Sequence, residues 1–429
     1  MERISMNQRE ARRLAVLEQV SSKKMSQKRA AELLGLSISR LKALVRDYRE
    51  NGARAAVHGN VGRAPHNAIT VEVKERVVEL YRSRYHDFNL SHFHEKLVEE
   101  HHLGISRPSV HRILSEYKIA SPRKHRRKKR HHRRNPRSRA GELVQLDASQ
   151  HDWFELGIDY HAHGAIDDAT GRVLGLYFDE QELTNAYFEV LLQINDDTGL
   201  PLEFYTDKRG CFRINSKESE LTLEEQLSGL TEPQTQFGRA LDELGIDLIY
   251  ANTPQATGRI ERLWGTFQDR VIKEMRLEGI KSPKDANEWS PYYLEKYNKQ
   301  FERPALDSEI AYLPKMPKKE LELILCHQEK RVLDAGLSFS YKTNIFVMPT
   351  QIKAQPKQII TVLESPRFGI KAKLKIGGKT VVVVPNQLQS RPIIEAVCSV
   401  SKHTQDINVR GQEYGRMGKA ASPWKYFEF

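Results

Sequence analysis

The chain has little cysteine and no long apolar run. Its three cysteines, Cys211, Cys326 and Cys398, are widely separated and form no Cys-x-x-Cys pair. This scarcity argues against a disulfide framework or a cysteine-rich zinc site and is typical of a reduced compartment. The N-terminus, Met-Glu-Arg-Ile-Ser-Met, has no apolar signal core, and no run approaches membrane-spanning length. The sequence therefore predicts a cytoplasmic protein with no membrane partner.

Positive charge is concentrated in the first third of the chain. Residues 1–140 hold 33 Lys/Arg against 14 Asp/Glu, whereas the other 289 residues hold 35 against 42. The formal charge of +12 therefore arises at the N-terminal side. Such a distribution indicates that this part binds a polyanion. At 429 residues the chain is long enough for several globular domains.

The N-terminal segment has the pattern of a helix-turn-helix unit. Ser26 and Ser37 are placed to cap two helices, and Gly35 lies in the turn between them. Arg40 and Arg46 lie off the apolar stripe of the second helix and are candidate DNA contacts. The stripe consists of Ile38, Leu41, Val45 and Tyr48. Any three-helix bundle would show a similar pattern.

A second helix-turn-helix unit is predicted at 66–120. Ser91 is placed to cap a helix that stops near Gly104, and Ser106 begins the next helix. Arg107, near the start of that helix, is a further candidate DNA contact. Tandem units would read a DNA site longer than one helical turn.

Histidines are numerous in the second unit, but no cysteine lies nearby to complete a usual zinc site. We therefore expect them to be surface residues, with a zinc site as the alternative. They are His86, His92, His94, His101, His102 and His111.

Residues 123–139 contain 11 Lys/Arg and no acid. Such a block repels itself and cannot pack, so it is at least a solvated linker. Contacts with DNA phosphates would add affinity through counterion release. The candidate contacts in this segment are Arg126, Arg127, Lys128, Lys129 and Arg130.

Beyond residue 140 the apolar pattern predicts a mixed α/β sheet covered by helices. After about residue 330, β-branched alternation punctuated by Gly, Asn and Pro predicts a small β-barrel. The expected strands are 143–148, 160–167, 171–178, 202–206 and 247–250, and the expected helices are 184–198, 236–244 and a long one from about 258.

These patterns divide the chain into seven parts. The predicted parts are two helix-turn-helix units (1–55 and 66–120), a basic linker (121–140), an α/β catalytic core (141–300), a helical connector (301–330), a small β-barrel (331–400) and a C-terminal tail (401–429).

Three carboxylates lie where a catalytic centre would form. Asp147 and Asp207 each end an apolar strand, and strand alternation puts Asp147 on the face opposite Leu146. Glu261 lies early in the long helix, at the edge of its apolar stripe and about 100° from Ile260. Three converging carboxylates are suited to hold two divalent cations for attack on a phosphodiester. Taken singly, each acid would more often be a surface or capping residue.

Four segments make a family resemblance specific. Leu146-Asp147, 165–172, 205–212 and 252–267 resemble the integrase catalytic core of retroviral-integrase-type DDE transposases, and the whole arrangement is similar to insertion-sequence transposases of the ISNCY type. The motifs cover about 141–275 strongly, the helix-turn-helix region moderately and the C-terminal part weakly.

The resemblance implies an RNase H-like fold with Asp147, Asp207 and Glu261 as catalytic, metal-binding triad. It implies two Mg²⁺ ions, with Mn²⁺ as a possible substitute. The implied partners are double-stranded DNA, as element ends with terminal inverted repeats and as target, and further copies of the chain in a synaptic complex. A bacterial, nucleoid-associated location and no small-molecule substrate complete these expectations.

Two departures from the family pattern lie near the site. Between Asp207 and Glu261 are 53 residues, more than in the commoner integrase core, and the surplus at 214–233 is polar and acidic. The usual Asp-Asn-Gly is Asp207-Lys-Arg-Gly here. Asp168 matches a family position in the hairpin, and we interpret it as a turn-forming acid.

Basic residues beside the acids are candidate phosphate contacts, although ordinary solvated side chains are an equal alternative. They are Lys208, Arg209, Arg259 and Arg262. Two other functions compete with transposition. A transcriptional regulator would combine the helix-turn-helix units with a non-catalytic RNase H-like core, and a nuclease of the same fold would cut DNA without joining it.

Overall fold

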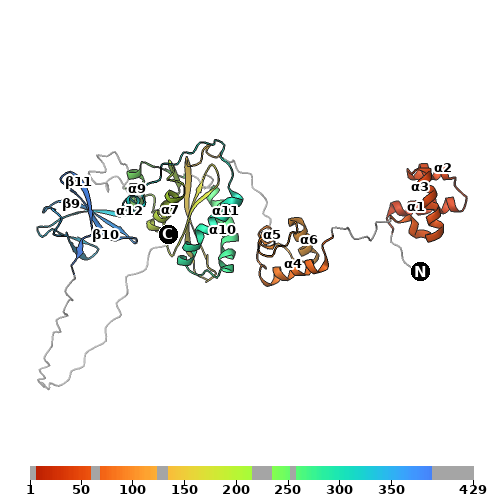
Figure 1. Ribbon diagram of the computed structural model, residues 1–429, viewed down its shortest axis with the longest axis horizontal. Helices are drawn as coiled ribbons and strands as arrows, with labels where there is room; N and C mark the ends of the chain where they lie inside the picture. The colour runs from red at the N-terminus through yellow and green to blue at the C-terminus, as the bar shows by residue number, and fades with distance from the viewer. Residues whose placement is uncertain (1–5, 59–67, 123–133, 215–233, 252–257, 389–429) are drawn as a thin grey trace, which may run out of the picture.

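The computed structural model describes residues 6–58, 68–122, 134–214, 234–251 and 258–388 (Figure 1). The candidate contacts Arg126–Arg130, the surplus at 215–233 and the predicted tail at 401–429 lie outside the described residues. The bounds of the seven predicted parts stay predictions.

The first helical unit forms as its capping residues predict. It consists of α1 (Gln8–Ser21), α2 (Gln27–Leu34), α3 (Ile38–Asn51) and the short 3₁₀ helix η1 (Gly52–Ala56). The side chains of Ser26 and Ser37 accept hydrogen bonds from the backbone N–H groups of Arg29 and Arg40. Gly35 ends α2 with a φ of 64°, a conformation that costs glycine little. Ile38, expected in the apolar stripe, is 48% exposed instead.

The second helical unit contains α4 (Val71–Ser83), α5 (Leu90–Glu99) and α6 (Arg107–Glu116). The Ser106 cap is confirmed, since its side chain accepts from Ser109 N. The Ser91 cap is wrong, because Asn89 caps α5 and accepts from His92 N. Helix α5 ends at Glu99, about one turn before Gly104, where the sequence predicted the end of this helix.

The central sheet is mixed, as predicted, with the strand order β3-β2-β1-β4-β5. The antiparallel strands are β1 (Leu143–His151), β2 (Tyr160–Asp167) and β3 (Val173–Asp179). Strands β4 (Glu203–Thr206) and β5 (Asp247–Tyr250) add on the other side of β1 and run parallel to it. The sheet thus joins an antiparallel meander to a parallel pair.

Helices cover both faces of this sheet (Figure 1). Val144 and Leu146 of β1 pack with α7 (Thr184–Asp197), α9 (Gln236–Leu244) and α12 (Lys318–Ile324). On the other face, α10 (Gly258–Leu277) and α11 (Pro283–Phe301) pack on β2 and β3. The apolar stripe predicted for α10 is buried in that second core. No helix in the described ranges is long and apolar enough to cross a membrane.

The predicted C-terminal β-barrel is not confirmed. Strands β6 (His327–Val332), β9 (Ile359–Ser365), β10 (Gly369–Ile376) and β11 (Lys379–Val383) form one open sheet, and β7 (Ser338–Tyr341), β8 (Asn344–Val347) and β12 (Asn386–Gln387) form another. Apolar residues of both sheets share one core. Alternating β-branched residues predicted the strands correctly, but such alternation does not specify whether a sheet closes.

Candidate active site

The register of β1 and β4 brings two of the predicted acids together. Gln145 of β1 lies beside Tyr205 of β4 in a parallel ladder. Two residues further along each chain come Asp147 and Asp207, so the same register places them next to each other. Neighbouring strands are about 4.8 Å apart. Strand β4 ends at Thr206, whereas β1 continues to His151. Asp147 therefore lies inside β1 rather than at its end, at the point where the neighbouring strand stops.

The Asp147 carboxyl group is mostly desolvated. Its pKa is raised to about 6, mainly by burial and to a smaller extent by the nearby Asp207 carboxylate. The Arg209 charge and a hydrogen bond from Trp264 Nε1 to Asp147 Oδ2, 3.1 Å long, act in the opposite direction. Two adjacent acids, both half-buried, thus lie at the point where β4 stops.

Helix α10 lies along β1 on the Asp147 face. Ile260 N donates to Gln145 Oε1 at 3.2 Å, and Gln268 Nε2 donates to Ser149 Oγ at 3.1 Å. Between these contacts lies the bond from Trp264 to Asp147. Residues four apart on the helix thus meet residues two apart on the strand, which confirms the predicted strand faces.

Gly164 makes room for Trp264, a role that sequence reasoning did not identify. It lies opposite Asp147 in the β1–β2 register. A Cβ atom built at Gly164 would lie 2.6 Å from the Trp264 ring. A glycine within a strand often marks such a close approach, and this was the available signal.

Glu261 is more exposed to solvent than the two aspartates. It is exposed in the first turn of α10, one residue beyond the buried Ile260. Among the described residues, no three His, Cys, Asp or Glu side chains form a group that would hold a metal ion. The structure therefore brings Asp147 and Asp207 together and leaves Glu261 on an exposed surface of the helix.

Arg209 contacts acids of the site rather than projecting freely into solvent. Its guanidinium group lies 2.7 Å from Asp207 Oδ2 and 2.6 Å from Glu182 Oε2. Glu182 in turn accepts a hydrogen bond of 2.8 Å from the Tyr187 hydroxyl. The adjacent Lys208 is exposed. Of this pair, Lys208 is the side chain available to a phosphate.

The interpretation of Asp168 as the turn-forming acid is wrong. Asp167 forms the turn, because its Oδ1 accepts from Ala169 N at 3.0 Å and Thr170 N at 2.8 Å. Asp168 is fully buried and pairs with Arg259 at 2.9 Å.

Further contacts to the Asp168 carboxylate come from Arg134 at 2.6 Å and Gln145 Nε2 at 2.9 Å. Asp168 thus ties the segment that enters the sheet, β1 and the start of α10 together. Arg259, a predicted DNA contact, is committed to this cluster.

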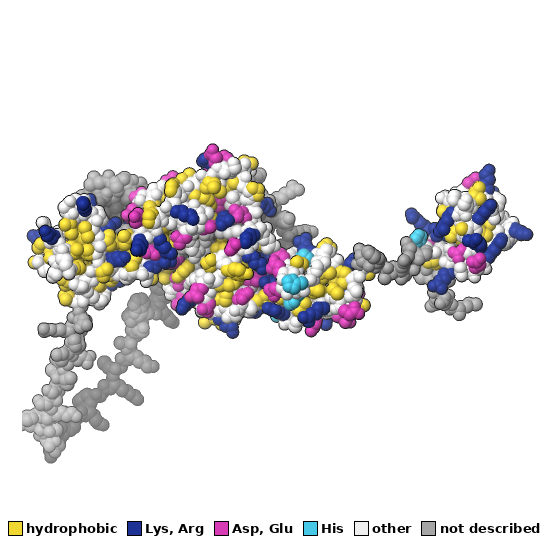
Figure 2. Space-filling view, in the orientation of Figure 1, with side chains coloured by type: hydrophobic (Ala, Val, Ile, Leu, Met, Phe, Trp, Pro, Cys, Tyr) yellow, Lys and Arg dark blue, Asp and Glu magenta, His cyan; other side chains and the backbone are white. Residues whose placement is uncertain are grey.

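The other candidate DNA contacts lie on exposed surfaces. Arg40 and Arg46 of α3 are exposed, as is Arg107 at the start of α6. Arg262 is exposed on α10 beside Glu261. The visible face of the first unit shows many Lys and Arg side chains (Figure 2). Their contact with DNA stays a prediction.

The histidines of the second unit are only partly on its surface. Figure 2 shows histidine side chains on the visible face of this unit, and His86, His102 and His111 are exposed. His92 is 2% exposed, which contradicts the surface prediction. Its Nε2 lies 2.6 Å from Glu274 Oε1 of α10, a contact between residues 182 positions apart that no local pattern reveals.

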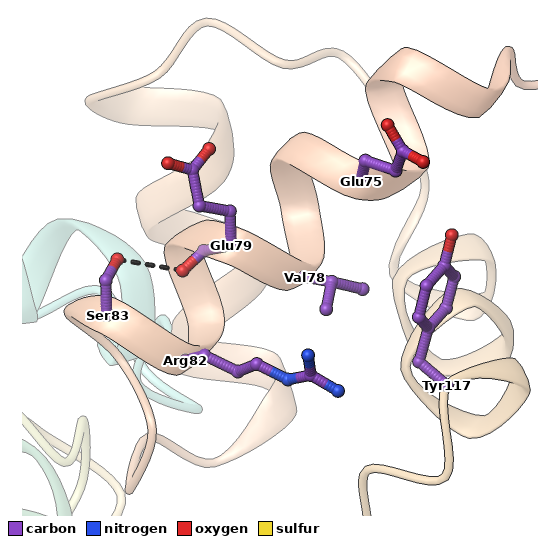
Figure 3. Close-up of a pocket in the computed structure, with 6 residues that line it drawn as sticks. All are labelled: Glu75, Val78, Glu79, Arg82, Ser83 and Tyr117. Atoms are coloured by element: carbon purple, nitrogen blue, oxygen red, sulfur yellow. Dashed lines mark hydrogen bonds between the residues drawn. The ribbon is translucent and has the colours of Figure 1, made fainter.

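A surface pocket also lies on the second unit, between α4 and the end of α6. Figure 3 shows Val78 and Tyr117 facing it from the two sides. Glu75 and Glu79 contribute two acids to its wall against the single base Arg82. This balance does not suit a phosphate-binding surface.

A helical unit of helix-turn-helix type joined to a mixed sheet with paired carboxylates is typical of proteins that process DNA, and sequence comparison makes this class specific. The helix-turn-helix domain family matches residues 12–65. The chain is 37% identical over 341 residues to the predicted transposase y4bF of Sinorhizobium fredii, covering 79% of this chain and 72% of that protein. It is 34% identical over 400 residues to the transposase for insertion sequence IS1202 of Streptococcus pneumoniae, covering 85% and 82%.

The chain therefore belongs to the transposases of insertion sequences, and this sequence prediction is confirmed. Among solved structures, the chain matches that of the simian T-cell lymphotropic virus intasome in complex with PP2A regulatory subunit B56 gamma. That match has a TM-score of 0.31 and 14% identity, covering 72% of this chain and 95% of that chain.

Proposed function

We propose that this chain binds the terminal inverted repeats of an insertion sequence and catalyses DNA cleavage followed by strand transfer. The observation that carries the proposal is the register of β1 and β4, which sets Asp147 beside Asp207. Glu261, on the first turn of the helix that contacts Asp147, is the third member. Family membership favours this reaction over a transcriptional regulator.

The donor set suits a hard divalent cation. Asp147 and Asp207 offer adjacent carboxylate oxygens, which Mg²⁺ prefers and Mn²⁺ also accepts. Asp147, Asp207 and Glu261 would together hold the two ions. Bound divalent cations supply Lewis acidity at the attacking and leaving oxygens of a phosphodiester.

The protein side chains have separate tasks in this reaction. Trp264 fixes the rotamer of Asp147 by donating to Oδ2. Glu182 restrains Arg209 through an ion pair, and Arg209 in turn partly neutralises the negative charge of Asp207. Arg262, exposed beside Glu261, is placed to contact the phosphate at the cut. No nucleophilic side chain is required, because water attacks first and the freed 3′-hydroxyl attacks target DNA second.

The DNA partners and the assembly follow from that sequence of steps. Joining two ends to one target requires that copies of the chain assemble around both ends, so we infer a homo-oligomeric synaptic complex. The reaction uses double-stranded DNA at the nucleoid and requires no small-molecule substrate.

The test is Mg²⁺-dependent cleavage of a plasmid that carries the gene with its flanking DNA. We expect Asp147→Asn to lower the cleavage rate by several orders of magnitude, whereas its affinity for the same DNA stays nearly unchanged. Asp159→Asn, which removes one exposed acid, is the matched control. Equal loss of cleavage and binding in Asp147→Asn would make Asp147 structural. Cleavage without product on a second DNA molecule would indicate a nuclease.

A further inference from the structure

The second helical unit is attached to α10 by a largely buried polar interface. Lys96 of α5 lies 2.6 Å from Glu274 of α10, with only 4% and 7% of the two residues exposed. His92 contacts the other oxygen of the same carboxylate. Burial opposes all three charges, but the contacts with Lys96 and His92 lower the pKa of Glu274 to about 2. Glu274 has these partners only in the docked arrangement, and removing one member would leave another buried and uncompensated.

Further contacts surround this cluster along the same helix. Arg270 makes a two-pronged ion pair with Glu95, at 2.6 and 3.0 Å. Arg276 lies 2.6 Å from Asp87. Leu277 packs against the apolar core of the second unit. Two-pronged arginine–carboxylate pairs fix orientation as well as distance.

Docking uses α5 and leaves α6 accessible. The exposed side chains of α6 include Arg107, His111 and Arg112. The docked half of α10, around Glu274, lies 13 residues from Glu261 on the same helix, which is about 20 Å at 1.5 Å per residue. One helix thus connects the second helical unit with a predicted catalytic acid.

We propose that this interface is a positioning device, in which α10 holds the second helix-turn-helix unit so that DNA gripped by α6 meets Asp147 and Asp207 at one fixed place. The inference rests on the proposed function. Glu95, Lys96, Arg270 and Glu274 are positioning residues that touch neither DNA nor the reacting atoms. They determine which phosphodiester is cut.

The test is a charge exchange across the interface in the full chain. Glu95→Arg and Arg270→Glu each place like charges together, and the double variant restores an opposite pair. Lys299→Glu makes the same charge change as a reversal in α11 at a residue that is exposed and outside the interface. Hydrogen exchange of α5 without DNA reports docking, and mapping of cuts on the plasmid described above reports position.

We expect each single variant to speed exchange in α5, to lower cleavage at the wild-type position about 100-fold and to spread cuts to neighbouring phosphodiesters. The double variant should restore protection and position together, and Lys299→Glu should match wild type.

Faster cleavage by the single variants would overturn the proposal, because the contact would then be inhibitory. Loosened α5 with unchanged cut position would also overturn it. A wild type that never cuts, but shows the docked exchange pattern, would refute the proposed function while the interface stood.

Discussion

The central region and the regions that flank it carry opposite charges. Residues 141–326 hold 19 Lys/Arg against 35 Asp/Glu. Residues 1–140 hold 33 against 14, and the C-terminal sheets at 327–388 hold 10 against 3. The part that would cut a polyanion is therefore itself strongly acidic.

Several arginines of the central region are engaged with its own acids. Arg172 pairs with Asp197 and Glu302, and Arg259 pairs with the buried Asp168. Excess positive charge and excess negative charge are therefore separated along the chain. Under the proposed function, the flanking regions would supply the positive charge that holds DNA, and the centre would supply the carboxylates that a cation needs.

The largest effect on DNA affinity is expected from the basic segment that precedes the sheet. Replacing 123–133 with a neutral Gly/Ser linker of equal length removes eight Lys/Arg without shortening the chain, and it keeps Arg134 on the buried Asp168. We expect DNA affinity to fall by about 1000-fold at moderate salt and the salt dependence to flatten, because fewer counterions are released. Affinity measured across a salt series checks this. An unaltered slope would make the segment a bare spacer and weaken the comparison.

A second prediction concerns pH and the acidic centre. Only the ionised Asp147 binds a cation, and its pKa is about 6, so Mn²⁺ binding should weaken as pH falls through that value. Arg209→Ala removes a positive charge that lowers this pKa, and the weakening should therefore move to higher pH. Electron paramagnetic resonance of added Mn²⁺ measures it without DNA.

Lys208→Ala is the matched control for that experiment, because it removes the same charge from the exposed neighbouring position. Identical pH profiles for wild type and Arg209→Ala would show that Arg209 does not act on Asp147.

A third prediction separates the fold of the centre from DNA binding by the flanks. In Gly164→Ala, the new methyl group meets the Trp264 ring, so we expect destabilisation of the central region by about 1–3 kcal/mol. Gly265→Ala, at an open position on α10, should instead stabilise by about 0.5–1 kcal/mol. Denaturant unfolding followed by tryptophan fluorescence checks both. A neutral Gly164→Ala would mean that Trp264 has room to move.

The smallest effect on DNA affinity is expected in the first helical unit. Arg46→Ala on α3 should reduce affinity by about 1–3 kcal/mol if it reads a base, or uniformly across sequences with a salt slope lower by about 1 if it contacts phosphate. Arg9→Ala, exposed on α1, is the control. Competition binding with end-containing and unrelated DNA distinguishes the cases. No change in either would remove α3 from the DNA-binding surface.

Features set by local chemistry were predictable from the sequence. The caps at Ser26, Ser37 and Ser106 form because a serine hydroxyl can reach an N–H group three residues ahead. The strand faces around Asp147 follow from the two-residue period. These features need no knowledge of distant segments.

Features set by distant partners were not predictable. His92 is buried only because Glu274 lies against it, and Asp168 is buried only because Arg134 and Arg259 converge on it. Summing charge over all residues after 140 also concealed the basic C-terminal sheets behind the acidic centre. Asn89 and Ser91 both offer a side-chain oxygen that could cap α5, so local sequence does not choose between them. Packing selects Asn89.

The pairing of α10 with β1 has a mechanical consequence. Four helical residues advance about 6 Å and two strand residues about 6.6 Å, so the two spacings nearly coincide. The contacts made by Ile260, Trp264 and Gln268 must therefore form or break together. A slide of α10 by less than one turn would lose all three. The position of α10 along β1 is therefore restricted to steps of one helical turn. Only at those positions does a residue of the helix lie opposite Asp147.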